Sequence, residues 1–131
     1  MTALMRDFIM TVQGPPCLIS SNHRTHWATR ALLTRQWREA THWAAKAARL
    51  PRGLDRVHIV AYVHPAKGGR LRDAHNVYPT GKACVDGLVD YGLIADDDDA
   101  HLIGPDLRRG ANRPVLTPAL KLTITELEVA P

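Results

Sequence analysis

Residues 70–99 read RLRDAHNVYPTGKACVDGLVDYGLIADDDD, and their charge sets them apart from the rest of the 131-residue chain. They hold seven of its thirteen acidic residues, all aspartates, against three basic residues, a formal charge of −4. The remainder holds fourteen Lys or Arg against six acids, a charge of +8. Because carboxylates repel phosphate unless a divalent cation lies between them, this contrast favours a metal-assisted site for a polyanion.

The same stretch predicts a helix. Asn76 is a suitable N-cap, and Pro79 is tolerated in the first turn because the N–H groups there have no intrahelical partner. The helix is expected to run to about Tyr91 and to end at Gly92. Its expected core residues are Cys84, Val85, Leu88 and Val89.

The flanking sequence predicts the other elements. Strands are expected at 8–13, 57–64, 101–107 and 120–127, where apolar or β-branched residues run or alternate between turn residues. A long amphipathic helix is expected over 29–50, with a core face of Leu33, Trp37, Ala40, Ala44 and Ala47. This order predicts a single small α/β (α+β) domain over 1–131, with a mixed sheet of about four strands packed against two main helices.

The basic residues of the first helix form no obvious stripe in the sequence, which indicates a solvated helix face rather than a binding surface. They are Arg30, Arg35, Arg38, Lys46 and Arg49.

Composition bounds the remaining possibilities. A net charge of +4 makes a polyanionic partner plausible, although many unrelated proteins share it. Cys17 and Cys84 lack the spacing of a zinc site, so free thiols in a reducing cytoplasm are expected. No stretch approaches the roughly 18 apolar residues of a membrane span, so we expect no membrane partner and a cytoplasmic location.

The acidic residues suggest cleavage of a phosphodiester with a metal. Asp73 precedes the helix, Lys82 lies on it one turn before Asp86, and Asp96 and Asp97 follow it. Carboxylates can hold Mg²⁺, and a lysine can neutralise charge on a phosphate. If the two acidic groups instead lie at opposite ends of the helix, about 20 Å apart, they cannot share a metal. Asp73 would then only favour the helix N-terminus, and the aspartate run would be an exposed loop.

Residues 73–99 resemble the RusA family of Holliday-junction resolvases, in which D-x-D-N is followed by a helix starting around a lysine, then D-x-L, a glycine and a D-D pair. The resemblance implies that Asp73 is the first metal-binding aspartate and Lys82 the catalytic lysine. It places the paired acids on Asp96 and Asp97, with Asp97 as the essential carboxylate. His75 stands where the family has its second aspartate.

The resemblance also implies a RusA-like fold and a function. The protein would be a homodimeric, Mg²⁺-dependent endodeoxyribonuclease that resolves four-way or other branched DNA by paired symmetric nicks, in DNA recombination and repair. A two-fold dimer suits a two-fold junction. The residues expected to contact the DNA are Asn22, Arg24, Lys67, Arg70, Arg72, Arg108, Arg109 and Arg113.

The loop that precedes the first helix has two interpretations. Residues 20–27 read SSNHRTHW, and Asn22, His23, Arg24 and His26 could hold phosphates. The alternative is a solvated loop with a serine or threonine that caps the helix.

His75 leaves three roles open. It could bind a softer metal such as Mn²⁺, hydrogen-bond a metal-bound water or the phosphate, or have no chemical role while Asp98 or Asp99 supplies the missing carboxylate. We favour the last two. One alternative function is therefore a junction-binding protein with weak or lost nuclease activity. Another is a basic interaction domain whose aspartate run contacts a protein partner or Ca²⁺, although the spacing of an EF-hand loop is absent.

Overall fold

The structure is a computed structural model and describes residues 5–21 and 26–128. In chain order its elements are β1 (Asp7–Gln13), α1 (Trp27–Ala47), β2 (Val57–His64), the short 3-10 helix η1 (Ala74–Val77), α2 (Tyr78–Tyr91), β3 (Leu102–Arg109) and β4 (Ala119–Glu126). The predicted α+β fold is confirmed, since the described residues form one mixed four-stranded sheet and two main helices.

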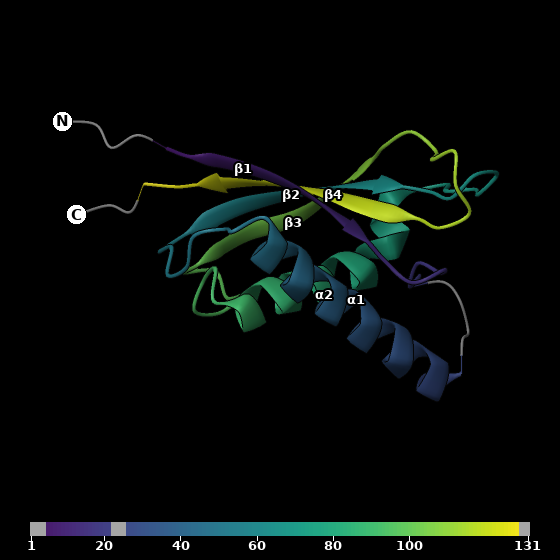
Figure 1. Cartoon of the computed structure of the whole chain (residues 1–131), viewed down its shortest axis with the longest axis horizontal. Coiled ribbons are helices and arrows are strands. Elements are labelled where there is room, and N and C mark those ends of the chain that lie inside the picture. Colours follow the sequence, from purple (N-terminus) through teal and green to yellow (C-terminus); the bar gives the residue numbers. More distant parts are fainter. Residues whose placement is uncertain (1–4, 22–25, 129–131) are drawn as a thin grey trace.

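The strands are arranged in the order β1-β4-β2-β3. β4 pairs antiparallel with both β1 and β2, whereas β2 and β3 run parallel. The alternation predicted for β2 is confirmed, because Val57, Ile59, Ala61 and Val63 are fully buried. Both helices lie against one face of the sheet (Figure 1), which explains why only alternate residues of the strands enter the core.

The buried stripe of α1 differs from the prediction in part. Trp37 is buried as expected, and its indole Nε1 donates to the carbonyl of Cys17 at 2.9 Å. The other fully buried positions are Thr41 and Ala45, while Ala47, expected in the core, is exposed. The buried face of α1 includes Thr41 because α1 packs against α2 as well as against the sheet. The Thr41 hydroxyl is satisfied inside the helix, where it donates to the carbonyl of Trp37 at 2.8 Å.

The helix boundaries also shift by a few residues. α1 begins at Trp27 and is capped by His26, whose Nδ1 accepts from the N–H of Ala28 at 3.2 Å, rather than by a serine or threonine. α1 ends at Ala47 instead of continuing to residue 50. α2 ends where predicted, because Gly92 adopts a left-handed conformation with φ 97° and caps the last turn.

The second helical segment is capped differently from the prediction. Asn76 was the expected cap, but Asp73 caps η1, and α2 follows from Val77 without a side-chain cap. Pro79 lies in the first turn of α2, as predicted.

Two further expectations concern the cysteines and membranes. Cys17 is an exposed free thiol and Cys84 a buried one, and burial raises the pKa of Cys84 to about 12. Within residues 5–21 and 26–128, no helix has the length and apolar character needed to cross a membrane.

Candidate functional site

Lys82 lies at the centre of the candidate site. It projects from α2, and its Nζ donates to Asp86 Oδ1 at 2.6 Å and to Asp97 Oδ2. Asp86 is one helical turn later, whereas Asp97 belongs to the segment that follows α2. Because both carboxylates contact the same nitrogen, this segment places Asp97 beside the turn that carries Asp86, not beyond the end of the helix.

Buried residues fix the path of that segment. Leu93 and Ile94 follow the helix directly, and both are almost completely buried. Asp96 then accepts a hydrogen bond from the N–H of Asp97 through Oδ1, at 2.8 Å. The apolar pair anchors the segment in the core, and the Asp96 carboxylate orients the backbone from which Asp97 reaches Lys82.

The rest of the aspartate run is used differently. The carbonyl of Asp98 accepts from the N–H groups of His101 and Leu102, at 3.0 and 2.9 Å. Its side chain also contacts His101 Nδ1 at 2.5 Å. Asp98 thus closes the turn that leads into β3, and Asp99 is exposed beside it. The four consecutive aspartates therefore do not form a uniform charged patch.

Lys82 and Asp97 each stabilise the charged form of the other. The hydrogen bond from Lys82 holds the pKa of Asp97 below its usual value. Partial burial acts to lower the pKa of Lys82, but the hydrogen bonds to Asp86 and Asp97 outweigh it, so the Lys82 pKa lies above its usual value. The site therefore presents the ammonium group of Lys82 between the side chains of Asp86 and Asp97, and 40% of the Lys82 side chain remains exposed.

Asp73 combines a structural contact with exposure. Its Oδ1 accepts from the backbone N–H of His75 at 2.9 Å and faces His75 Nδ1 at 3.2 Å. The backbone hydrogen bond from His75 lowers the pKa of Asp73, so this carboxylate is ionised at neutral pH. The Asp73 side chain is 58% exposed, which leaves it accessible to a ligand from solvent.

The predicted metal ligands do not form a cage of three or more side chains among the described residues. Within the described part of the chain, no three His, Cys, Asp or Glu side chains converge as a metal ion would require. Mg²⁺ often needs no such cage, because one or two carboxylates hold it while water and substrate phosphates complete its shell. Asp73, Asp96 and Asp97 each offer the carboxylate oxygens that Mg²⁺ prefers, whereas the ring of His75 is turned toward Asp73.

Two of the predicted DNA-contact residues lie in adjoining loops. Lys67 donates its backbone N–H to the carbonyl of Val115 at 2.7 Å, and Arg113 donates its backbone N–H to the carbonyl of Pro65 at 2.8 Å. The loops after β2 and before β4 extend together from one end of the sheet (Figure 1). The Arg113 guanidinium also donates to the carbonyl of Thr117 at 2.9 Å, so this residue braces its own loop.

Four other predicted DNA-contact residues have defined positions. Arg108 and Arg109 end β3, two residues beyond the strand expected at 101–107, and both are exposed. Arg70 and Arg72 line a hollow of about 570 Å³ together with Asn76. Arg72 directly precedes Asp73 in the chain. Asn22 and Arg24 lie outside the described residues, as does His23 from the same loop.

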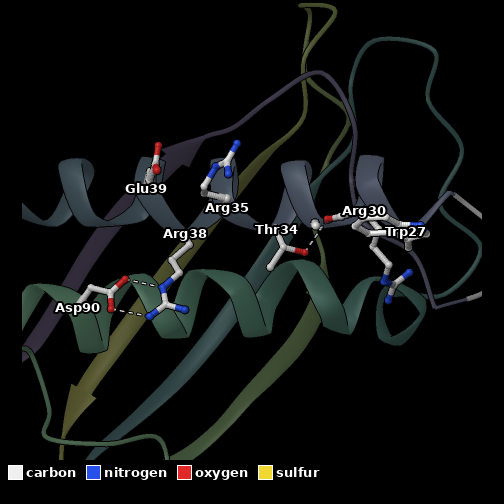
Figure 2. Close-up of a pocket in the computed structure, with 8 residues that line it drawn as sticks. Trp27, Arg30, Thr34, Arg35, Arg38, Glu39 and Asp90 are labelled. Atoms are coloured by element: carbon white, nitrogen blue, oxygen red, sulfur yellow. Dashed lines mark hydrogen bonds and ion pairs between the residues drawn. The ribbon is translucent and has the colours of Figure 1, made fainter.

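One feature of α1 was missed in the sequence. Arg30, Arg35 and Arg38 were interpreted as scattered, but all three line one hollow together with Trp27 (Figure 2). Residues 27, 30, 31, 34 and 38 recur at spacings of three and four, which places them along one helix face, while Arg35 borders the hollow from the other side of α1 (Figure 2). That spacing was the available signal. The pattern becomes visible only when Trp27, Ala31 and Thr34 are placed on the helix together with the arginines.

A comparison with models of protein families and with curated proteins found nothing that matches this chain. Any assignment of function therefore depends on the chemistry of the site itself and on the resemblance in residues 73–99.

Proposed function

We propose that this protein is a divalent-metal-dependent endonuclease that cuts branched DNA, with Lys82 and Asp97 at the centre of its active site. The observation that carries the proposal is the contact of Lys82 Nζ with Asp97, across the segment that follows α2. The RusA resemblance assigns its catalytic lysine and its essential acid to these same two residues. The contact joins two residues fifteen positions apart, which supports a shared role for them.

The chemistry divides among the residues as follows. Mg²⁺ held by Asp73 and Asp97, when bound, would polarise the scissile phosphate and make water a better nucleophile. The ammonium of Lys82 would neutralise the negative charge that develops on the phosphate oxygens. Asp86 contacts Lys82 independently of Asp97, so it would keep the lysine in position while Asp97 contacts other groups. Hydrolysis then adds water across one P–O bond.

The substrate would approach through charge. Outside residues 70–99 the chain carries an excess of +8, and basic residues on the loops and on β3 would contact the DNA backbone without reading its sequence. The preference for four-way junctions, the homodimer and the two symmetric nicks are carried by the resemblance, because a two-fold dimer presents one active site to each of two opposing strands.

The decisive experiment uses a labelled four-way junction and a linear duplex of the same sequence, each with Mg²⁺ or Mn²⁺. We expect the wild-type protein to make paired nicks in the junction. Asp97→Asn and Lys82→Met should each reduce the cutting rate by about a hundredfold or more. Asp55→Asn, an exposed acid between α1 and β2, is the matched control and should cut normally.

Two outcomes would overturn the proposal: no cutting with either metal, or variants at Asp97 and Lys82 that cut like the wild type. Circular dichroism of each variant separates loss of chemistry from loss of folding. Light scattering at micromolar concentration tests the dimer. A monomer that still makes paired nicks would remove the symmetric model and leave the nuclease.

The second candidate is a junction-binding protein that has lost its nuclease activity. It is favoured by His75, whose ring faces Asp73 Oδ1 at 3.2 Å where the family would supply another carboxylate. The variant His75→Asp distinguishes the two functions. If the wild type binds junctions without cutting them and His75→Asp cuts, the second candidate is correct.

A further inference from the structure

A hollow of about 650 Å³ lies along α1 and extends to α2, and none of its lining residues belongs to the proposed cutting site. Trp27 is at one end, at the start of α1, and the ion pair of Arg38 with Asp90 is at the other (Figure 2). From Trp27 to Arg38 the helix rises about 16 Å, at 1.5 Å per residue. The hollow is therefore long enough for more than one chemical group of a ligand.

Trp27 presents an aromatic surface to this hollow. The residue is 76% exposed, and its ring stacks on His26, with the ring centroids 5.7 Å apart and the planes at 30°. Ala31 and Thr34, which follow along the same face, are small. The floor beside the indole is thus open and largely apolar, which suits a flat ring better than a charged group.

The cations that surround this floor differ in their availability. Arg38 is held by Asp90 through two contacts, at 2.5 and 2.7 Å, and Arg30 donates to the carbonyl of Ser20 at 3.0 Å. Arg35 makes no ion pair or side-chain hydrogen bond within the described residues. Figure 2 shows Arg30 and Arg38 extending toward α2, while Arg35 extends to the other side of α1. Glu39, one turn after Arg35, also lines the hollow, so an anion is best placed at the Trp27 end beside Arg30, whose partner is a neutral carbonyl and not a carboxylate.

We propose that this hollow binds an unpaired nucleotide of a DNA strand, with its base stacked on Trp27 and its backbone phosphate contacted by Arg30. Stacking on an exposed aromatic ring, combined with a cationic groove, is the usual chemistry of single-strand binding. A duplex offers no free base face to Trp27. The excess of arginine over carboxylate in the lining favours an anionic ligand over a neutral one, and the aromatic surface of Trp27 favours a nucleic-acid base over the side chains of an acidic peptide.

This binding goes beyond the proposed cutting, because it requires neither a metal nor Lys82. An unpaired nucleotide does occur where DNA strands part, so a nuclease for branched DNA would have a use for such a site. The two ideas can fail separately, and the experiment is designed so that they do.

The test measures fluorescence anisotropy of a labelled single-stranded oligothymidine and of a labelled duplex of equal length, in EDTA and at low salt. We expect Trp27→Ala to weaken single-strand binding about tenfold and Trp27→Phe to weaken it less. Arg30→Gln should also weaken it. The matched controls lie on the same helix outside the hollow: Trp43→Ala, at a residue 61% exposed, and Lys46→Gln should leave binding unchanged.

The proposal is overturned if Trp27→Ala and Trp43→Ala have equal effects, or if an acidic peptide binds in a Trp27-dependent way while the oligonucleotide does not. Asp97→Asn, which should lose cutting, is expected to retain oligonucleotide binding that depends on Trp27. A protein that binds but never cuts would contradict only the proposed function. A protein that cuts junctions but binds single strands equally well with and without Trp27 would contradict only this inference.

Discussion

At the scale of single residues, Gly87 determines how closely the two helices can pack. A Cβ atom added there would lie 2.3 Å from the carbonyl oxygen of Arg38 and 2.8 Å from Thr41 Cβ. We expect Gly87→Ala to destabilise the protein by about 1–3 kcal/mol, because the backbone of α1 cannot move aside without disturbing the core. This loss should exceed the roughly 1 kcal/mol that alanine gains over glycine in a helix.

The matched control is Gly81→Ala, on the same helix with the same gain in helix propensity. There the nearest atom is Leu107 Cδ1 at 3.2 Å, the end of a flexible side chain. Thermal unfolding followed by circular dichroism should therefore give a clearly lower midpoint for Gly87→Ala than for Gly81→Ala. Equal midpoints would show that the helices are less tightly packed than the structure indicates.

The residues of the candidate site were only partly predictable. The pairing of Lys82 with Asp86 follows from their spacing of four on a helix, and the structure confirms it. The contact between Lys82 and Asp97 could not be derived from spacing, since it depends on the burial of Leu93 and Ile94, a tertiary effect. The capping contact of Asp73 with His75 was also not foreseen.

At the scale of elements, every predicted strand and both main helices are present, because strong apolar periodicity survives in any tertiary context. The order of the strands was not predictable. Alternation shows which side of a strand is buried but not which strand lies beside it. β3 extends to Arg109, beyond the predicted end at residue 107, because its last two residues pair with β2.

The ion pair between Arg38 and Asp90 links α1 to α2 and gives their packing a pH dependence. Hydrogen bonding from Arg38 lowers the pKa of Asp90 below its usual value. Stability from a carboxylate with a depressed pKa is present above its unfolded value and is lost as the pH falls through the folded value. We therefore expect Asp90→Asn to lower the unfolding midpoint at neutral pH, and the difference from wild type to shrink as the pH falls below about 4.

The expected effect at neutral pH is small, about 0.5–1 kcal/mol, because both side chains are partly exposed. Asp55→Asn provides the control, since Asp55 makes no ion pair within the described residues. Midpoints of wild type and both variants, measured between pH 2.5 and 7, check the prediction. A difference between wild type and Asp90→Asn that persists undiminished at pH 2.5 would contradict it.

At the scale of the whole molecule, the structure places two aspartates of the acidic stretch around one lysine. The excess of +8 lies outside residues 70–99, while within that stretch Asp86 and Asp97 gather around one lysine. If DNA reaches Lys82, its phosphates must approach these carboxylates, which repel them unless a divalent cation is present.

This repulsion gives the last prediction. Without a divalent cation, in EDTA, Asp97→Asn should bind a four-way junction more tightly than the wild type, by about fivefold, because removal of one close negative charge is worth about 1 kcal/mol. Adding Mg²⁺ should strengthen binding by the wild type more than by the variant. Asp7→Asn makes the same charge change at an exposed position in β1 and should have little effect. Gel-shift titrations at fixed ionic strength measure all three proteins. Equal affinities of wild type and Asp97→Asn in EDTA would mean that the DNA phosphates do not approach Asp97, and the DNA path across Lys82 would have to be abandoned.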